Sequence, residues 1–267
     1  MTEYAYAKIN LNLFCVRKRP DGYHDLKTVM HTVSLCDRVE CEKIDGLFVN
    51  CSDPDIPSGR DNIAYKCAVA FTETFRTGGA RIYIEKNIPS RAGLGGGSAD
   101  GAAVIRAMAK LYGIDDRNAL IRVAAQCGAD VPFCLAGGCA LCEGTGDVMT
   151  PMPTLSGNVV IAKGAAGIST PEAYRLIDTV PPFDMNDTDR LPRYSGIPLY
   201  NDFERVCSLS DAAYIKSVLG EERSLMTGSG SAVFGLIPDK NEAERLAEAL
   251  REKGYFAGVY EFTGGLM

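Results

Sequence analysis

The segment "IPSRAGLGGGSADGAA", residues 88–103, decides the fold of this chain and raises the question of what its five glycines serve. Strand-like alternation in residues 80–86 leads into it, and apolar positions at helical spacing follow it. The start of a helix presents free backbone N–H groups and a partial positive charge, which together suit a phosphate group. The alternative is a mobile turn that Ser98 caps. We interpret the segment as a phosphate-binding loop.

The segment differs from the two best-known phosphate loops. A Walker A loop needs a Lys-Ser/Thr pair after its last glycine, and this chain has none there. The dinucleotide fingerprint needs a third glycine where Ser98 stands. A second loop of small residues, "TGSGS" at 227–231, leads into another strand-like segment and could also be only a tight turn. Two such loops in one chain favour the interpretation that both face the same ligand.

The composition is that of an ordinary globular protein. The 267 residues are 46% hydrophobic and 23% charged, enough for one large domain or two modest ones. The formal net charge is −6 and the densest basic run is only residues 17–19, so we expect no nucleic-acid partner. No leader pattern opens the sequence, and its longest apolar run is too short for a membrane span. We therefore expect a cytoplasmic protein without a membrane partner.

Ten cysteines occur in the chain. Without a secretory signal they are better interpreted as buried thiols in a reducing compartment than as disulfides. One CxxC pair, Cys139 and Cys142, lacks further ligands at metal-binding spacing, so we expect no metal site built from protein side chains.

The remaining elements follow from periodicity. Residues 4–16 alternate as a strand, with Lys8, Asn10 and Asn12 on its polar side, and "RPDGYH" at 19–24 is a turn. Two prolines near residue 152 mark a boundary, so the prediction is an α+β protein with units 1–152 and 153–267. Other predicted strands and helices lie at 26–41, 63–75, 80–86, 104–111, 120–127, 158–163, 172–178, 232–237, 242–253 and 256–262, with a polar loop at 180–196.

Four sequence segments, taken together and in order, resemble the GHMP kinase superfamily. They are "AKINLNLFCVRKRPDGYHDLKTVMHTVSLCD", "IPSRAGLGGGSADGAA", "GADVPF" and "TGSGSAVF", and they run from the first strand to the last part of the chain. The pairing of "AKINL" with "RPDGYH" is similar to the branch that acts on a cytidylated sugar alcohol. Residues 180–200 match weakly.

The resemblance implies a two-domain GHMP kinase fold. Its amino-terminal α/β domain would contain a left-handed crossover, its carboxy-terminal domain would be ferredoxin-like, and the active site would lie between them. The implied activity is ATP-dependent phosphorylation of the 2-hydroxyl of a cytidine-diphospho methylerythritol, on the methylerythritol phosphate route to isopentenyl diphosphate. Mg²⁺ would be carried mainly by the nucleotide phosphates. A monomer or a weak homodimer is expected.

The resemblance also implies roles for particular residues, although several have a plainer alternative. Lys8 and Asp130 would be the catalytic pair, whereas alone they would be interpreted as a solvated lysine and a turn or capping residue. The implied substrate-binding residues are Asn10, Tyr23, His24, Thr170 and Tyr174, with the two tyrosines on either side of the cytosine and His24 at its edge. The implied nucleotide-binding residues are Asn62 near the adenine, and Pro89, Ser90, Arg91, Ala92, Gly93, Leu94, Gly95, Gly96, Gly97, Ser98 and Ala99 around the phosphates.

Two residues depart from the family pattern. Ala99 stands where a second serine is usual, and Gly101 stands where alanine is usual. A glycine inside a helix costs about 1 kcal/mol relative to alanine. Both departures bear on nucleotide affinity and leave the expected fold unchanged.

Two other functions compete with this one. The first is a GHMP kinase for a mevalonate-type or homoserine-type alcohol, against which the "RPDGYH" turn and Tyr174 argue, because they offer an aromatic clamp. The second is a catalytically silent ATP-binding sensor, against which the retention of both Lys8 and Asp130 argues.

Overall fold

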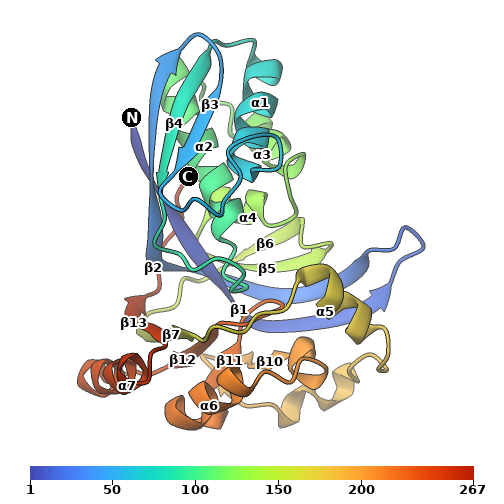
Figure 1. The fold of residues 1–267 in the computed structure, drawn as a ribbon. Coiled ribbons are helices and arrows are strands. Elements are labelled where there is room, and N and C mark those ends of the chain that lie inside the picture. The colour runs from blue at the N-terminus through green and yellow to red at the C-terminus, as the bar shows by residue number, and fades with distance from the viewer.

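The computed structural model describes residues 1–267 and contains two main sheets. The larger sheet is built on a long antiparallel pair, β1 (Thr2–Lys18) and β2 (His24–Ile44), which runs through the middle of the molecule and projects as a hairpin on one side (Figure 1). The farther half of β2 pairs with β4 (Gly79–Glu85), which pairs in parallel with β3 (Phe48–Cys51). The half nearer the hairpin pairs with β5 (Cys139–Gly144), and β5 pairs with β6 (Val148–Met152).

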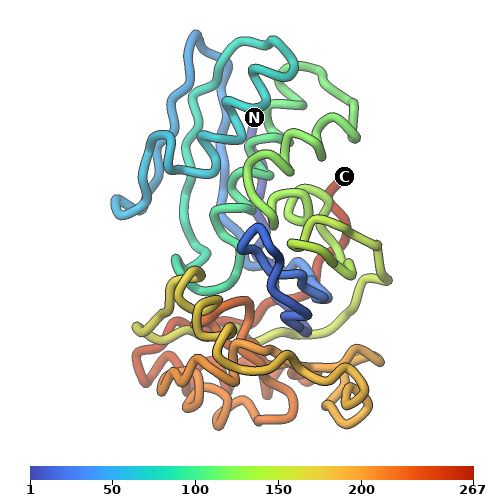
Figure 2. Tube along the Cα trace, turned by 90° about the vertical axis from the view of Figure 1, so that its right-hand side faces the viewer, coloured from blue at the N-terminus to red at the C-terminus, as the bar shows by residue number.

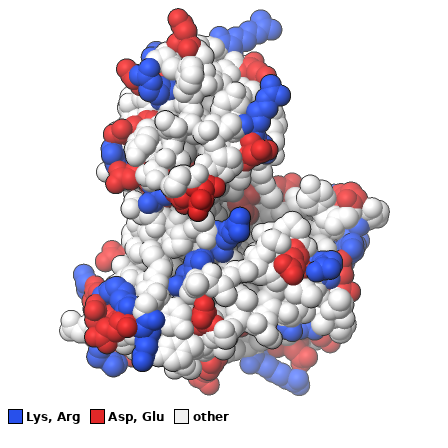
Figure 3. All heavy atoms as spheres, in the orientation of Figure 1, with Lys and Arg blue, Asp and Glu red and all other residues white.

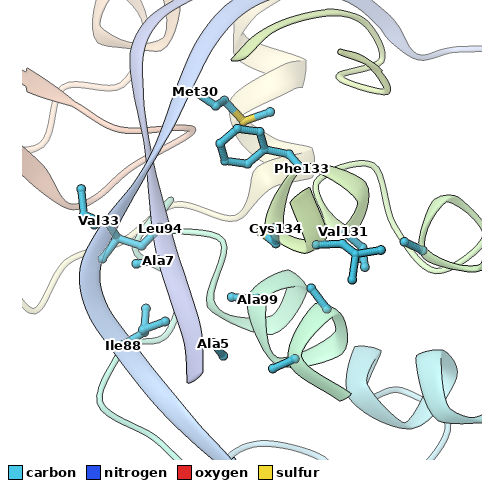
Figure 4. Close-up of a cluster of buried hydrophobic side chains, with 14 of the residues drawn as sticks. Ala5, Ala7, Met30, Val33, Ile88, Leu94, Ala99, Val131, Phe133 and Cys134 are labelled. Carbon is cyan, nitrogen blue, oxygen red and sulfur yellow. The ribbon is translucent and has the colours of Figure 1, made fainter. Parts of the chain in front are cut away.

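Four helices lie on one side of this sheet (Figure 1). They are α1 (Ile63–Phe75), α2 (Gly96–Tyr112), α3 (Arg117–Ala125) and α4 (Val131–Ala136). Helix α2 is the central one, because residues 99–109 are all buried and it contacts α1, α4 and β1. The helix predicted at 104–111 is therefore confirmed, but residues 99–109 are buried on all faces of the helix and not on one face alone. Figure 4 shows the packing, with Ala99 of α2 and Phe133 of α4 facing β1 and β2.

Gly101 explains how α2 fits against α1. A Cβ atom at Gly101 would lie 2.6 Å from Cys67 Sγ and 3.1 Å from Ile63 Cγ2. Real Cβ atoms do not approach other heavy atoms so closely, so the glycine lets the two helices pack around the Cys67 thiol. The loss in helix propensity is offset by a close contact that alanine would prevent.

The smaller sheet has the strand order β11-β12-β7-β13, and every neighbouring pair is antiparallel. Its strands are β7 (Asn158–Lys163), β11 (Ser224–Met226), β12 (Val233–Leu236) and β13 (Phe256–Glu261). Helices α5 (Thr170–Ile177) and α6 (Ser210–Leu219) lie between the first two strands in sequence, and α7 (Lys240–Glu252) precedes the last. This connectivity, with the first and third strands in the centre, is the ferredoxin-like arrangement, as predicted.

Three segments join the two sheets. Strand β1 contributes to both hydrophobic cores, because Leu11 belongs to the larger one and Leu13 and Cys15 belong to the smaller one. Strand β10 (Tyr200–Asn201) pairs in parallel with β1. The chain end after β13 returns to the larger sheet, where Phe262 bridges to Val33, and Figure 2 shows this end beside the upper part.

Most predicted elements are present, and the differences have local causes. The helix at 63–75 and the strand at 158–163 have the predicted bounds. The polar loop at 180–196 contains the 3₁₀ helix Met185–Arg190 and the short strand β8 (Arg193–Tyr194), which pairs with β9 (Ile197–Pro198). Strand β1 is interrupted by bulges and is buried on both sides over residues 7–15, so strict alternation does not hold. No helix of the chain has both the length and the apolar character that crossing a membrane requires.

Candidate active site

A buried lysine lies where β1 passes the glycine-rich loop. Lys8 is 5% exposed, and its Nζ donates a hydrogen bond to Asn10 Oδ1 at 2.6 Å. Asn10 Nδ2 in turn donates to Thr28 Oγ1 at 2.8 Å, so the amide oxygen faces the lysine. Lysine is rarely buried without partners. The polar row predicted along β1 is therefore an internal network that fixes the position of the ammonium group.

The partner of Lys8 across the site is Asp130, whose Oδ2 lies 3.7 Å from Lys8 Nζ. Asp130 occupies the position before α4, where an aspartate commonly caps the helix, yet its side chain makes no capping hydrogen bond. Its carboxylate is 35% exposed. The side chain thus makes no capping hydrogen bond to the backbone and can meet both the ammonium group and a ligand.

The glycine-rich loop, residues 88–95, lies directly against Lys8. Lys8 N donates to Leu94 O at 2.9 Å, and a Cβ atom on Gly95 would lie 2.9 Å from Lys8 Cγ. Gly95 has a φ of 70°, which favours glycine, and it precedes the first residue of α2 without any side-chain cap. Ser98 lies in the first turn and does not cap the helix. The N–H groups that open α2 are therefore left for another partner.

The second small-residue loop contacts the first one. A Cβ atom on Gly93 would lie only 2.0 Å from the backbone oxygen of Thr227, and Ala232 N donates to Ala92 O. Thr227 Oγ1 accepts from Asn10 N at 3.0 Å, and Thr170 Oγ1 lies 3.2 Å from Ser229 Oγ. The two loops, β1 and the start of α5 thus meet at one place.

The other predicted nucleotide-binding residues lie around this loop in different settings. Asn62 is buried and caps α1, since its Oδ1 accepts from Ala64 N and its Nδ2 donates to Pro57 O. Ser90 and Arg91 are exposed. Ala92, Leu94 and Ala99 are buried, Pro89, Gly93, Gly95, Gly96 and Ser98 are half-buried, and Gly97 is exposed.

The predicted base-binding residues lie where the hairpin of β1 and β2 meets α5. The His24 ring stacks on Tyr174, with centroids 4.8 Å apart, and the Phe203 ring lies nearly perpendicular to Tyr174, with centroids 5.0 Å apart. Burial raises the pKa of the Tyr174 hydroxyl. Tyr23 stands at the hairpin turn and is 66% exposed. The structure therefore brings His24 and Tyr174 together and leaves Tyr23 in solvent.

A buried ion cluster beneath the loop was not predicted. Lys86 Nζ, at the end of β4, contacts Asp37 and donates to Asp100 Oδ2 at 2.6 Å, while Asp100 Oδ1 has no partner. Burial raises the pKa of Asp100 to about 7, and the neighbouring Asp37 acts in the same direction. The three residues lie on three separate elements, within β2, directly after β4 and in α2, so no local pattern could have suggested the cluster.

The space-filling view shows a hollow between the upper and lower parts of the molecule, and basic side chains gather in it (Figure 3). The arrangement of a glycine loop at a helix start, a buried lysine and a free carboxylate suits transfer of a phosphoryl group to an alcohol.

Comparison with known proteins agrees with this class. Residues 62–138 match the pattern of the GHMP kinases N terminal domain, and residues 205–255 match that of the GHMP kinases C terminal domain. The chain belongs to the GHMP kinase family. The predicted fold class is thereby confirmed.

The names of similar relatives specify one kinase within this family. A protein of Caldicellulosiruptor saccharolyticus named 4-diphosphocytidyl-2-C-methyl-D-erythritol kinase is 40% identical, with 92% of this chain and 91% of the relative covered. A protein of Desulfitobacterium hafniense with the same name is 39% identical, with 96% and 93% covered. A solved 4-(cytidine 5'-diphospho)-2C-methyl-D-erythritol kinase has a TM-score of 0.80 and 35% identity over 97% of this chain and 99% of its own.

Solved structures of two other kinases share the fold at lower identity. A homoserine kinase from Cytophaga hutchinsonii has a TM-score of 0.73 and 19% identity, with 99% of this chain and 95% of that chain covered. The mevalonate kinase of Methanococcus jannaschii has a TM-score of 0.74 and 12% identity, with 99% and 98% covered. The homoserine-type and mevalonate-type alternatives are therefore less supported.

Proposed function

We propose that this chain transfers the γ-phosphoryl group of ATP to the 2-hydroxyl of 4-diphosphocytidyl-2-C-methyl-D-erythritol, giving the 2-phosphate and ADP. The relatives named for this activity support the choice of substrate. The observation that carries the chemistry is the Asp130 carboxylate, which makes no capping bond and faces the Lys8 ammonium group at 3.7 Å.

Lys8 and Asp130 act on the acceptor hydroxyl and on the moving phosphoryl group. Asp130 accepts a hydrogen bond from the 2-hydroxyl, orients its oxygen toward the γ-phosphorus and takes up the proton as the new P–O bond forms. The bond between the γ-phosphorus and the bridging oxygen breaks, and ADP leaves with that oxygen. Lys8, which Asn10 holds in place, lies beside Asp130 and stabilises negative charge on the transferred group.

The start of α2 holds the ATP phosphates in this proposal. Gly93 and Gly95 allow the backbone to lie close to Lys8 and Thr227, so the free N–H groups of the first turn face the same place as the ammonium group. No three His, Cys, Asp or Glu side chains cluster to bind a metal ion, and we propose that Mg²⁺ stays on the phosphate oxygens. When bound there it neutralises their charge.

The hairpin and α5 hold the cytidine end. Tyr174 and the exposed Tyr23 offer aromatic faces to the cytosine, and His24 contacts its edge, while Thr170 and Asn10 contact the rest of the acceptor. Base stacking on an aromatic ring contributes about 1–3 kcal/mol and does not distinguish the bases, so His24 supplies the selectivity.

We also propose that the chain divides into units 1–152 and 153–267, and that it acts as a monomer or a weak homodimer. Strand β6 ends at Met152 in the larger sheet and β7 begins at Asn158 in the smaller one, which supports this division. Every group named in the reaction comes from one chain.

The test is release of ADP from ATP and Mg²⁺ with four acceptor conditions: the cytidylated alcohol, mevalonate, homoserine and no acceptor. We expect turnover with the cytidylated alcohol alone. Asp130→Asn should abolish it, while Asp115→Asn, the same change at an exposed position, should not. Turnover with another alcohol would move the assignment to a related kinase. Tight ATP binding without any transfer would favour the sensor.

A further inference from the structure

The Asp178 carboxylate joins Lys18 and His24, the two polar side chains that flank the hairpin turn. Its Oδ1 lies 2.8 Å from His24 Nε2, and its Oδ2 accepts from Lys18 Nζ at 2.5 Å. Asp178 follows the last residue of α5, whereas Lys18 and His24 end β1 and begin β2. The carboxylate therefore ties the helix that carries Tyr174 to both strands of the hairpin.

The direction of the hydrogen bond follows from the charge on Asp178. Hydrogen bonds from Lys18 and from His24 lower the pKa of this carboxyl, so it is ionised near neutral pH. A carboxylate can only accept hydrogen bonds, and the Nε2 atom of His24 must therefore carry the proton. In the neutral ring Nδ1 then becomes an acceptor, and Nδ1 has no hydrogen-bond partner within the chain.

The ring is also fixed in orientation. The His24 side chain is only 6% exposed and stacks on Tyr174, with an angle of 27° between the planes. Turning the ring over by 180° would keep the stack but would replace Nε2 by a carbon atom opposite Asp178 and break that bond. The unpartnered Nδ1 thus stays in one place relative to Tyr174.

We propose that Asp178 is a positioning residue that sets the nucleobase preference, by holding His24 with Nδ1 as an acceptor for a base that presents an amino group. This inference rests on the proposed function, in which His24 meets the edge of the base. Cytosine presents a donor, the N4 amino group, where uracil presents an acceptor, the O4 atom. The His24 Nδ1 atom accepts a hydrogen bond from the N4 amino group of cytosine. Facing the O4 atom of uracil, it would place two lone pairs against each other, which is repulsive.

The second histidine of the chain provides an internal reference. His31 is fully buried, with its Nδ1 2.8 Å from the carbonyl of Thr32, and its Nε2 accepts from Leu155 N at 3.0 Å. A carbonyl accepts and a backbone N–H donates, so His31 carries its proton on Nδ1. The two histidines of the chain therefore have opposite tautomers.

The first test needs no substrate. NMR of isotope-labelled imidazole nitrogens is recorded at a pH well above the ordinary histidine pKa of about 6.5. It should show one histidine protonated on Nε2 and the other protonated on Nδ1. His24→Gln should remove the Nε2-protonated one. In Asp178→Asn, Lys18 retains the amide oxygen, so the amide NH₂ faces Nε2 and the His24 proton should move to Nδ1. A wild-type His24 protonated on Nδ1, or no change in the variant, overturns the proposal.

The second test measures selectivity. The ratio of kcat/KM for the cytidine-diphospho acceptor over its uridine analogue should fall about 5- to 150-fold in Asp178→Asn, the range that a matched base contact is worth. Asp189→Asn is the matched control, because the Asp189 side chain is 94% exposed, and its ratio should equal that of the wild type. An unchanged ratio in Asp178→Asn, with the tautomer switched, refutes the assignment.

Failure of the proposed function gives a different result. In that case the unaltered protein turns over neither acceptor, and the tautomers still follow the first test. Calorimetric binding of cytidine diphosphate against uridine diphosphate, in wild type and Asp178→Asn, then decides the base preference directly. The same ratio of affinities for cytidine diphosphate and uridine diphosphate in wild type and in Asp178→Asn refutes the role of Asp178.

Discussion

The two ends of the candidate site differ in how firmly the protein holds them. At the phosphoryl-transfer end Lys8, Asn10 and Thr28 are buried and hydrogen-bonded to one another, and the glycine loop packs on Lys8 at contact distance. At the base-binding end Tyr23 is largely in solvent, and the Lys18–Asp178 ion pair is partly exposed. Under the proposed function, the groups that carry out the reaction are held in the interior, whereas one of the two aromatic faces for the base stands in solvent until the ligand binds.

The sharpest way to break the interior end is Lys8→Met. Methionine fills nearly the same volume without charge, so we expect kcat to fall about 10²- to 10⁴-fold, the range typical for a group acting on the transferred charge or proton. The thermal midpoint should change little. Steady-state kinetics and a melting curve check this. A variant that keeps most of its kcat would show that Lys8 only supports the fold.

At the exposed end, Tyr23→Ala should weaken binding of the acceptor and leave kcat nearly unchanged. Loss of one stacking face corresponds to an increase in the acceptor KM of about 5- to 150-fold. Tyr23→Phe keeps the aromatic face and is the matched control, with a KM near that of the wild type. A fall in kcat with an unaltered KM would contradict the division between the two ends.

A smaller effect is expected from Gly101→Ala, which adds a Cβ atom 2.6 Å from Cys67 Sγ. We expect the free energy of unfolding to fall by about 1–3 kcal/mol, as is usual for overpacking. Adding Cys67→Ala should recover part of that loss, because it removes the thiol that the new methyl group meets. A double-mutant cycle in denaturant measures the coupling, and additive effects would show that the contact is not what requires glycine.

A further prediction concerns pH. The folded-state pKa of Asp100 is raised from an ordinary 3.8 to about 7, so its ionisation opposes folding. The unfolded chain releases this proton first, and the contribution of Asp100 to stability is complete below about pH 4 and declines as the pH rises toward 7. Asp100→Asn should lessen that decline in unfolding measurements between these values. An identical pH profile in both proteins would contradict the raised pKa.

The sequence predicted the parts of this molecule that depend on local pattern. The helix at 63–75 has a clear apolar period, and Asn62 before it acts as its cap. The turn "RPDGYH" was predicted because Gly22 can take a positive φ, and its φ is 87°. The adjacency of Lys8 and Asn10 followed from their spacing along one strand.

The remaining parts depend on contacts between distant residues. Helix α4 was not predicted because its six residues, "VPFCLA", are too few to show a period. The Lys86 cluster and the bond between His24 and Asp178, which are 154 residues apart, have no signature in either local segment. From the sequence, Gly101 was interpreted only as a loss of helix stability. The Cys67 thiol that requires a glycine at this position lies on another helix, so the sequence could not show the contact.

Strand β1 has a consequence for any attempt to divide the molecule. A fragment of residues 153–267 would leave gaps in its interior where Leu13 and Cys15 now pack, and β10 would lose the strand it pairs with. The complementary fragment would expose those same side chains to water. A cut at the boundary between the sheets would therefore yield two fragments, each of which needs the other to complete a hydrophobic interior. Neither fragment should fold stably by itself.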